Sequence, residues 1–198
     1  MVRALLNNAA VIERAAELAD RDGLDKVTLA AVARSFDVRS PSLYAHVRDV
    51  GALHDGVTSV ALGQLADRIS EGIAGRSGKD ALTAFAQAHR DYMQEHPGRW
   101  DALRRRAGAT AVQSSEAARL VRVTEAVLRG YGIVGDDRTH AIRILGGALN
   151  GFLELERAGS FSHRSPAAKD TWPHLLSALD LVLSGWTTTV INSQDAQC

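Results

Sequence analysis

Apolar residues recur every three or four positions along most of this chain, and that spacing limits its possible folds more than any other feature. Residues with this spacing lie on one face of an α-helix, where they can pack against a core. Strict alternation of apolar and polar residues, which would indicate a strand, never extends far. The sequence therefore predicts an all-α protein. The first stripe, in residues 8–21, consists of Val11, Ile12, Ala15, Ala16, Leu18 and Ala19.

Glycine, proline and helix-capping residues divide this pattern into separate helices. We expect a three-helix head of residues 1–50, continued without a flexible linker by a helical body of residues 51–198. Thr28 is placed to cap the second helix and Pro41 to begin the third. Residues after Val190 are polar and are expected to fray. The predicted helices span about residues 8–21, 29–36, 41–47, 49–72, 78–95, 97–107, 114–131, 136–158 and 170–190.

Charge is balanced over the whole chain but not along it. Lys and Arg together number 23, as do Asp and Glu. From Lys26 to Arg48, however, four basic residues stand against one acidic residue, Asp37, so a neutral average hides a basic segment. No apolar run reaches the roughly 18 residues of a membrane span, and the start does not resemble an export signal, so we expect a soluble, cytoplasmic protein. The single cysteine, Cys198, excludes an intrachain disulfide.

Residues 28–47 are predicted to form two short amphipathic helices joined by a tight turn, which is the size and order of a helix-turn-helix unit. Leu43 and Val47 satisfy the buried side of the second helix and leave its polar side chains free. Such side chains suit a DNA groove, where they can meet base edges and phosphates. Taken alone, Tyr44 would more often be a packing residue, and Arg39 or Arg48 a solvated surface charge. The candidate DNA-binding residues are Thr28, Arg39, Ser40, Pro41, Ser42, Tyr44, His46 and Arg48.

The segment Pro41-Ser42-Leu43-Tyr44-Ala45-His46-Val47, with the helices before it, resembles the N-terminal domain of TetR-family transcriptional regulators. The resemblance implies a homodimeric repressor that binds palindromic operator DNA and leaves it when a small molecule enters the body. Two positions depart from the family pattern: Asp37 replaces the usual glycine of the turn, and Val50 replaces a lysine that contacts phosphate. Asp adopts a left-handed backbone more readily than most residues, so we still expect the turn to form.

Two segments of the body also resemble one subgroup of that family. His96-Pro97-Gly98-Arg99-Trp100 is similar to its His-Pro-Gly element, and residues 147–156 are similar to its Trp-His-Gly segment. The resemblance implies that the last two long helices form a four-helix bundle across a two-fold axis. Both are apolar on more than one face, which favours burial against a partner chain. The predicted interface residues are Leu145, Phe152, Leu176, Leu179, Leu183 and Trp186.

A small-molecule pocket is expected among the middle helices of the body. Its side chains are of types that more often form ordinary core, and nothing in the sequence identifies the ligand. The candidate ligand-binding residues are Phe85, His89, Tyr92, Trp100, Leu103, Val123, Val127 and Leu149.

Other function classes are less well supported by the sequence. No glycine-rich phosphate loop, nucleophile elbow or zinc-protease helix motif occurs, so we expect no enzymatic activity, no cofactor and no metal. Asp136, Asp137 and His140 suggest a metal but more often cap a helix. The run 104–106 of three arginines is more often a solvated helix face than a second nucleic-acid patch. A helical ligand-binding or interaction module without DNA binding remains the alternative.

Overall fold

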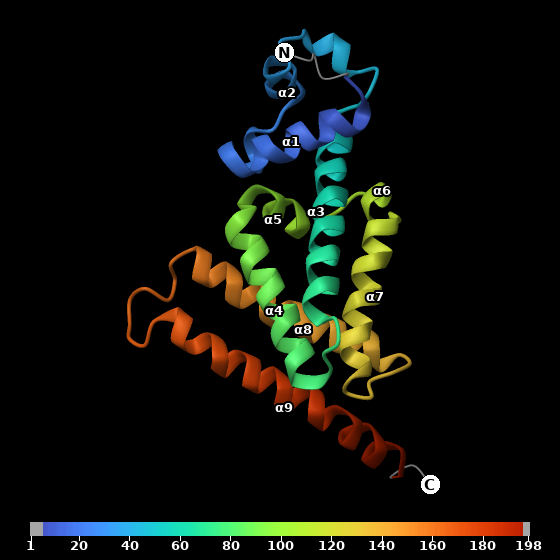
Figure 1. Ribbon diagram of the computed structural model, residues 1–198, viewed down its shortest axis with the longest axis vertical. Coiled ribbons are helices and arrows are strands. Elements are labelled where there is room, and N and C mark those ends of the chain that lie inside the picture. Colours follow the sequence, from blue (N-terminus) through green and yellow to red (C-terminus); the bar gives the residue numbers. More distant parts are fainter. Residues whose placement is uncertain (1–5, 196–198) are drawn as a thin grey trace. The chain divides into compact units, whose positions relative to one another are not determined.

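The structure is a computed structural model that describes residues 6–195, with side chains described up to residue 186. Its regular elements in this range are all helical, and no strand occurs among the described residues (Figure 1). The prediction of an all-α protein is confirmed. The elements are α1 (Asn8–Asp22), η1 (Leu24–Lys26), α2 (Leu29–Ser35), η2 (Ser40–Leu43), α3 (Val50–Ile73), α4 (Gly78–Glu95), α5 (Pro97–Arg104), α6 (Ala109–Val112), α7 (Ser115–Arg129), α8 (Asp137–Arg157) and α9 (Ala168–Asp195).

The helices of the body differ from the predicted ones at three places. The short helix α6 was not expected, and α5 ends at Arg104 rather than near residue 107. Helix α9 continues to Asp195, so the predicted fraying directly after Val190 is wrong. Neither glycine nor proline follows Val190 in the sequence to end the helix. Cys198 lies outside the described residues.

The third helix of the predicted head is a single 3₁₀ turn, η2, rather than an α-helix of residues 41–47. Its amides bond three residues back, from Ser42 to Arg39 and from Tyr44 to Pro41. Only at Val47, whose amide bonds to Leu43, does the α-helical spacing return. Serine and proline are poor residues for a helix interior, and so short a segment does not establish the regular four-residue ladder.

Helix ends in the head follow the predicted capping chemistry. The Thr28 hydroxyl accepts a hydrogen bond from the Ala31 amide at 3.1 Å, which confirms the predicted cap of α2. Asp37 has a φ of 56°, the left-handed conformation that the turn requires, so the replacement of glycine is tolerated as expected. At the start of α3, the Asp49 carboxylate accepts from the Ala52 amide at 2.7 Å.

The chain packs into two compact units. Unit 1 comprises the described residues up to Asp67 together with Asp91–Leu120, and unit 2 comprises Arg68–Arg90 and the residues from Val121 onward. Helices α3, α4 and α7 each contribute residues to both units. Because these units are defined by packing, the functional division at residue 50 stays a prediction.

Unit 1 has a core in which α1 lies across the N-terminal part of α3 (Figure 1). Gly56 of α3 lets the two helices come close, since a Cβ atom there would lie 2.2 Å from Cδ1 of Ile12. Leu43 of η2 and Val32 of α2 are fully buried in the same core. The predicted stripe on α1 is confirmed, because Val11, Ile12, Ala15, Ala16, Leu18 and Ala19 are all buried.

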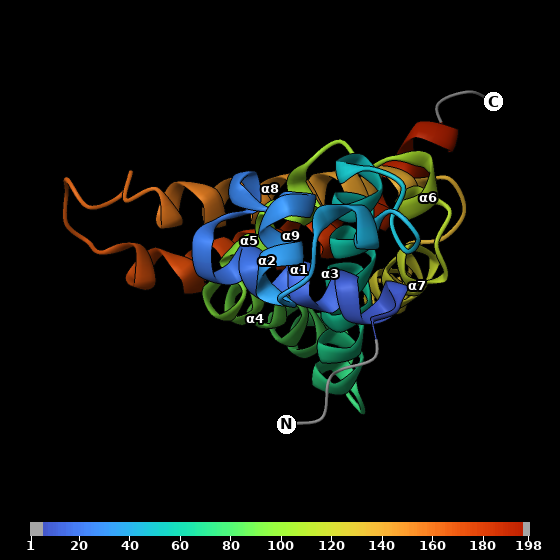
Figure 2. The ribbon, with the colours of Figure 1, turned by 90° about the horizontal axis from the view of Figure 1, so that it is seen from above.

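Unit 2 contains α8 and α9, which pack side by side and are joined by residues 158–167. This connection projects beyond the two helices in both views (Figures 1 and 2). None of the helices within residues 6–195 combines the length and the hydropathy needed to cross a membrane.

The interface residues predicted on α8 and α9 stay a prediction, and the structure shows how far each is buried within its own chain. Leu145, Leu176, Leu179 and Leu183 are buried against their own chain, so little of their surface is left for a partner. Phe152 and Trp186 are half-buried. A helix that is apolar all round does not reveal from its sequence which side faces its own core. The large apolar side chains exposed on these helices are instead Ile144, Leu155, Leu181 and Val182.

Candidate nucleic-acid interface

The segment around η2 has one buried anchor and an exposed polar surface. Leu43 is fully buried and Val47 is 3% exposed, so both hold the segment to the core of unit 1. Tyr44, directly after Leu43, is 58% exposed. The structure thus places every predicted DNA-contact residue at least partly at the surface: Thr28, Arg39, Pro41, Ser42, Tyr44 and Arg48 are exposed, and Ser40 and His46 are half-buried.

Asn8 fixes the end of this segment to α1. Its side-chain amide donates a hydrogen bond to the backbone carbonyl of His46 at 2.7 Å. The contact joins residues 38 positions apart, and no local sequence pattern indicates it. The hydrogen bond fixes the turn before α3 relative to the first turn of α1. Arg48 lies two residues after His46 in this turn.

Arg48 is exposed but not unpaired. Its Nε donates to the Asp49 carboxylate at 2.8 Å, and 84% of the Arg48 side chain is exposed. The Ala52 amide and the Arg48 guanidinium hold the pKa of Asp49 below its ordinary value, so this carboxylate stays charged. Arg48 can therefore reach a phosphate, but it must first leave a neighbouring anion. Val50, where the resemblance implies a phosphate-binding lysine, is 44% exposed and supplies no charge.

The Thr28 hydroxyl already accepts a hydrogen bond as the cap of α2. A hydroxyl group also has one hydrogen to donate, so an anion at this position can be bound without loss of the cap. The seven-residue helix α2 adds little dipole of its own.

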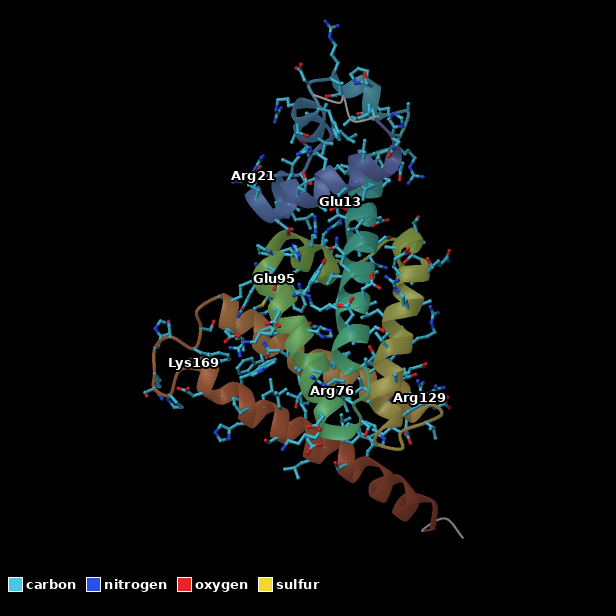
Figure 3. The ribbon with its side chains drawn as sticks, in the orientation of Figure 1. Glu13, Arg21, Arg76, Glu95, Arg129 and Lys169 are labelled. Carbon is cyan, nitrogen blue, oxygen red and sulfur yellow. The ribbon has the colours of Figure 1, made fainter. Side chains whose placement is uncertain are left out.

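Arg99 of α5 links the helices on which this surface is built. Its Nη2 donates to Glu13 at 2.8 Å and its Nη1 donates to Gln64 at 3.1 Å. Its backbone amide donates to Asp20 at 2.9 Å, and the ring Nδ1 of His96 lies 3.1 Å from the same carboxylate. Glu13 lies on the side of α1 that borders α5 (Figure 3). The side chain of Arg99 is only 8% exposed and that of Asp20 18%, whereas Glu13 is 48% exposed, so the Asp20 contact is the more sheltered of the two ion pairs.

Gly98 brings α5 against the backbone of α1. A Cβ atom at this position would lie 2.0 Å from the carbonyl carbon and oxygen of Ala19. Trp100, two residues further along α5, is 1% exposed and belongs to the core. The segment His96 to Trp100 was recognised by resemblance alone, and its structural role is to fasten α5 to α1.

The residues predicted to bind a ligand are distributed over both units. Tyr92, Trp100 and Leu103 belong to unit 1, where Tyr92 donates to Gln64 at 2.9 Å. In unit 2, Phe85, Val127 and Leu149 are buried, and His89 and Val123 are half-buried. Burial lowers the pKa of His89 to about 4, and its Nδ1 lies 2.8 Å from the Phe85 carbonyl oxygen. A common pocket for these eight residues stays a prediction.

Two bacterial regulators are similar to most of this chain. The HTH-type transcriptional regulator Rv0681 of Mycobacterium tuberculosis is 32% identical over 162 residues, which cover 79% of this chain and 72% of the relative. The HTH-type transcriptional regulator YobS of Bacillus subtilis is 30% identical over 152 residues, which cover 76% of this chain and 78% of YobS. The family model described as "Tetracyclin repressor-like, C-terminal domain" matches residues 82–179.

Solved structures share the fold at lower sequence identity. BioQ of Mycobacterium smegmatis has a TM-score of 0.70 at 19% identity, with 91% of this chain and 99% of BioQ covered. BioQ with its natural double-stranded DNA operator has a TM-score of 0.65 at 21% identity, with the same coverage. ActR of Streptomyces coelicolor in complex with (S)-DNPA has a TM-score of 0.65 at 18% identity, with 91% of this chain and 89% of ActR covered.

Proposed function

The chain belongs to the TetR family of helix-turn-helix transcriptional regulators, and we propose that it represses transcription by binding a palindromic operator as a homodimer. Its function as a DNA-binding regulator follows from that membership. Repression, the operator symmetry and the residues that contact DNA are the proposal. We further infer that it acts in the cytoplasm and has no enzymatic role, since its relatives are named regulators.

The observation that carries the proposal is the combination of a buried Leu43 with an exposed Tyr44 next to it. The buried Leu43 fixes the orientation of the segment, so that Tyr44 faces solvent. Arg39 and Ser42 are suited to base edges and phosphates, and the Tyr44 hydroxyl to a phosphate. Two such segments in a dimer must lie roughly 34–36 Å apart to enter one face of the duplex.

The homodimer is proposed to form through a different surface of α8 and α9 than the sequence indicated. On α8, Ile144, Gly147, Gly151 and Leu155 are exposed and follow a helical spacing of three and four residues. A Cβ atom at Gly147 or Gly151 would meet nothing within 4 Å in its own chain. Small residues on an exposed helix face allow a second helix to approach closely.

We propose that a small molecule releases the protein from DNA. ActR binds (S)-DNPA, and a comparable ligand here would act through its different affinity for the DNA-bound and free conformations. Residues 1–50 would then serve as the DNA-binding domain and residues 51–198 as the ligand-binding and dimerisation domain. Arg99 is suited to transmit such a change within unit 1, since it joins α5 to Glu13 and Asp20 of α1.

A DNA-binding titration tests the proposal. Wild-type protein is first used to select operators from a random DNA pool, and affinity is then measured on the selected DNA and on random DNA. Tyr44→Ala should abolish the preference for selected DNA. Arg48→Ala should weaken binding to both and reduce the salt slope by about one. Arg76→Ala, at an exposed arginine between α3 and α4, is the matched control and should change neither (Figure 3).

Two outcomes would contradict the assignment. Equal loss on both DNAs with Tyr44→Ala would remove the role given to that side chain. If the wild-type protein binds neither selected nor random DNA, the proposal itself is overturned. The chain would then be a ligand-binding or interaction module without DNA binding.

A further inference from the structure

The connection between α8 and α9 borders an open hollow that none of the predicted ligand-binding residues lines. The hollow has a volume of about 340 Å³, which is within the range of small-molecule sites. It lies wholly within unit 2, in the segment that projects beyond the two helices (Figures 1 and 2).

One wall of the hollow is a cluster of aromatic rings. Phe152 of α8 has its ring centroid 5.1 Å from that of Phe161 in the connection and 5.6 Å from that of Trp172 in α9. Trp172 is fixed in place, because its Nε1 donates to Gln87 at 3.2 Å and the Arg90 guanidinium lies 4.7 Å from its ring centroid. Phe152, which does line the hollow, therefore packs against a fixed ring, so a flat apolar group could stack on it at little cost in ordering.

Basic side chains also line the hollow. His163 and Arg164 line the hollow, and no acidic residue does. Arg90 behind the aromatic cluster is neutralised by its ion pair with Glu156. Within residues 6–195, by contrast, neither His163 nor Arg164 takes part in an ion pair. Arg164 is thus a cation without an anion, next to an apolar surface.

Hydroxyl groups complete the lining at Ser160, Ser165 and Thr171. They can donate hydrogen bonds to a second oxygen of an anion held by Arg164. Aromatic rings for stacking, together with a cation and hydroxyl donors, fit one chemical class. We propose that this hollow binds a small aromatic carboxylate, with its ring against Phe152 and Phe161 and its carboxylate on Arg164.

Such a site would give the regulator a second place to sense a metabolite, and in that respect the inference rests on the proposed function. A ligand here would join the end of α8 to the start of α9, because Phe152 and Thr171 belong to those helices. Any binding that favours one arrangement of the two helices then changes the stability of the folded protein.

Calorimetric titration of the full chain without DNA tests the inference. The probes are benzoate and phenylacetate, with neutral benzamide as the uncharged analogue. We expect saturable binding of at least one carboxylate and much weaker binding of benzamide. Arg164→Gln should weaken the carboxylate about tenfold, as the loss of one charge-assisted hydrogen bond does. Phe161→Ala should weaken both kinds of probe, and Arg143→Gln, at an exposed arginine of α8 outside the hollow, should change neither.

Several results would overturn the inference. The first is that neither carboxylate binds saturably at millimolar concentration. The second is that benzamide binds as tightly as the carboxylates. The third is that Arg164→Gln and Arg143→Gln weaken carboxylate binding equally. The oligomeric state of each variant is measured in parallel by light scattering. If Phe161→Ala dissociates a dimer and the wild-type protein binds none of the probes, a second copy of the chain occupies the hollow instead of a ligand. Because no DNA is present, failure here leaves the DNA-binding proposal intact.

Discussion

The Arg99 guanidinium and the Asp20 carboxylate form an ion pair that joins α5 to α1, with Nε 3.3 Å from Oδ2. The side chains are 8% and 18% exposed. Asp20 also accepts a hydrogen bond from the Arg99 backbone amide, so this carboxylate is hydrogen-bonded to the backbone of Arg99 and ion-paired with its side chain. A charge pair in so sheltered a position is costly to break from one side, because the remaining charge is left without a partner.

Replacement of Arg99 by alanine should therefore destabilise the protein by about 3 kcal/mol. Arg99→Lys keeps the charge but cannot reach Glu13, Gln64 and Asp20 together, so its loss should be intermediate. Urea denaturation of the wild type and both variants measures the difference. A loss for Arg99→Ala within about 0.5 kcal/mol of zero, the range of ordinary surface changes, would contradict the role of this pair.

Gly98→Ala tests the close contact of α5 with α1 separately from charge. The added Cβ would meet the backbone of Ala19 at 2.0 Å, and backbone cannot move aside as a flexible side chain can. We expect a loss of at least about 2 kcal/mol, as for overpacked cores. Gly72→Ala is the matched control, because its Cβ would lie an ordinary 3.7 Å from Ala84 and alanine favours helix by up to about 1 kcal/mol. Similar melting temperatures for the two variants would refute the argument.

Features that depend on a few neighbouring residues were predictable from the sequence. The Thr28 cap and the left-handed Asp37 are examples, because each depends on local backbone chemistry. The burial of Leu43 beside an exposed Tyr44 was predictable too, since helical spacing separates the two faces. The candidate DNA-contact surface was therefore largely defined by residues 28–48.

Features that depend on which helices meet were not predictable. Arg99 and Asp20 are 79 positions apart, and nothing in either local sequence indicates the other. On α8, Leu145 and Ile144 are equally apolar, yet the first is 1% exposed and the second 46%. Only the packing of α8 against its own unit decides which of them is left for a partner.

Asp49→Asn should strengthen binding to random DNA. Asparagine retains the oxygen that caps α3 through the Ala52 amide, but it no longer holds Arg48 by an ion pair. Removal of a negative charge beside the phosphates and release of Arg48 should raise the salt slope by up to about one. Asp80→Asn, an equal change of charge at an exposed position of α4, is the control. Unchanged affinity of Asp49→Asn over a range of salt would show that Arg48 does not contact DNA.

Leu181→Glu should convert a dimer to a monomer. Leu181 is 73% exposed on α9, and a carboxylate buried between two chains would lose its hydration without a partner. Light scattering coupled to size exclusion measures the mass. Val112→Glu, at a 63% exposed valine of α6, controls for an added surface charge and should leave the mass unchanged. A dimer that survives Leu181→Glu would place the interface elsewhere.

His89 should make the stability of the protein depend on pH. Burial lowers the pKa of its imidazole to about 4, whereas an unfolded chain has an ordinary histidine pKa of about 6.5. Between these values the unfolded state binds a proton that the folded state does not, so acidification favours unfolding. The contribution of His89 is fully present above about pH 6.5 and is lost as the pH falls to about 4. Since His89 is only half-buried, about 3 kcal/mol is an upper limit for the loss.

His89→Leu removes the titrating group while keeping a side chain of similar size. The free energy of unfolding, measured by urea at pH values from 7 to 4, should fall less steeply for this variant than for the wild type. His174→Leu, at an exposed position of α9, controls for the loss of an imidazole as such. Because other groups titrate in the same range, the decisive quantity is the difference in slope between the two variants. If the free energies of unfolding of the two variants fall in parallel with pH, His89 has the same pKa in the folded and unfolded states, and its burial does not disfavour the charged form.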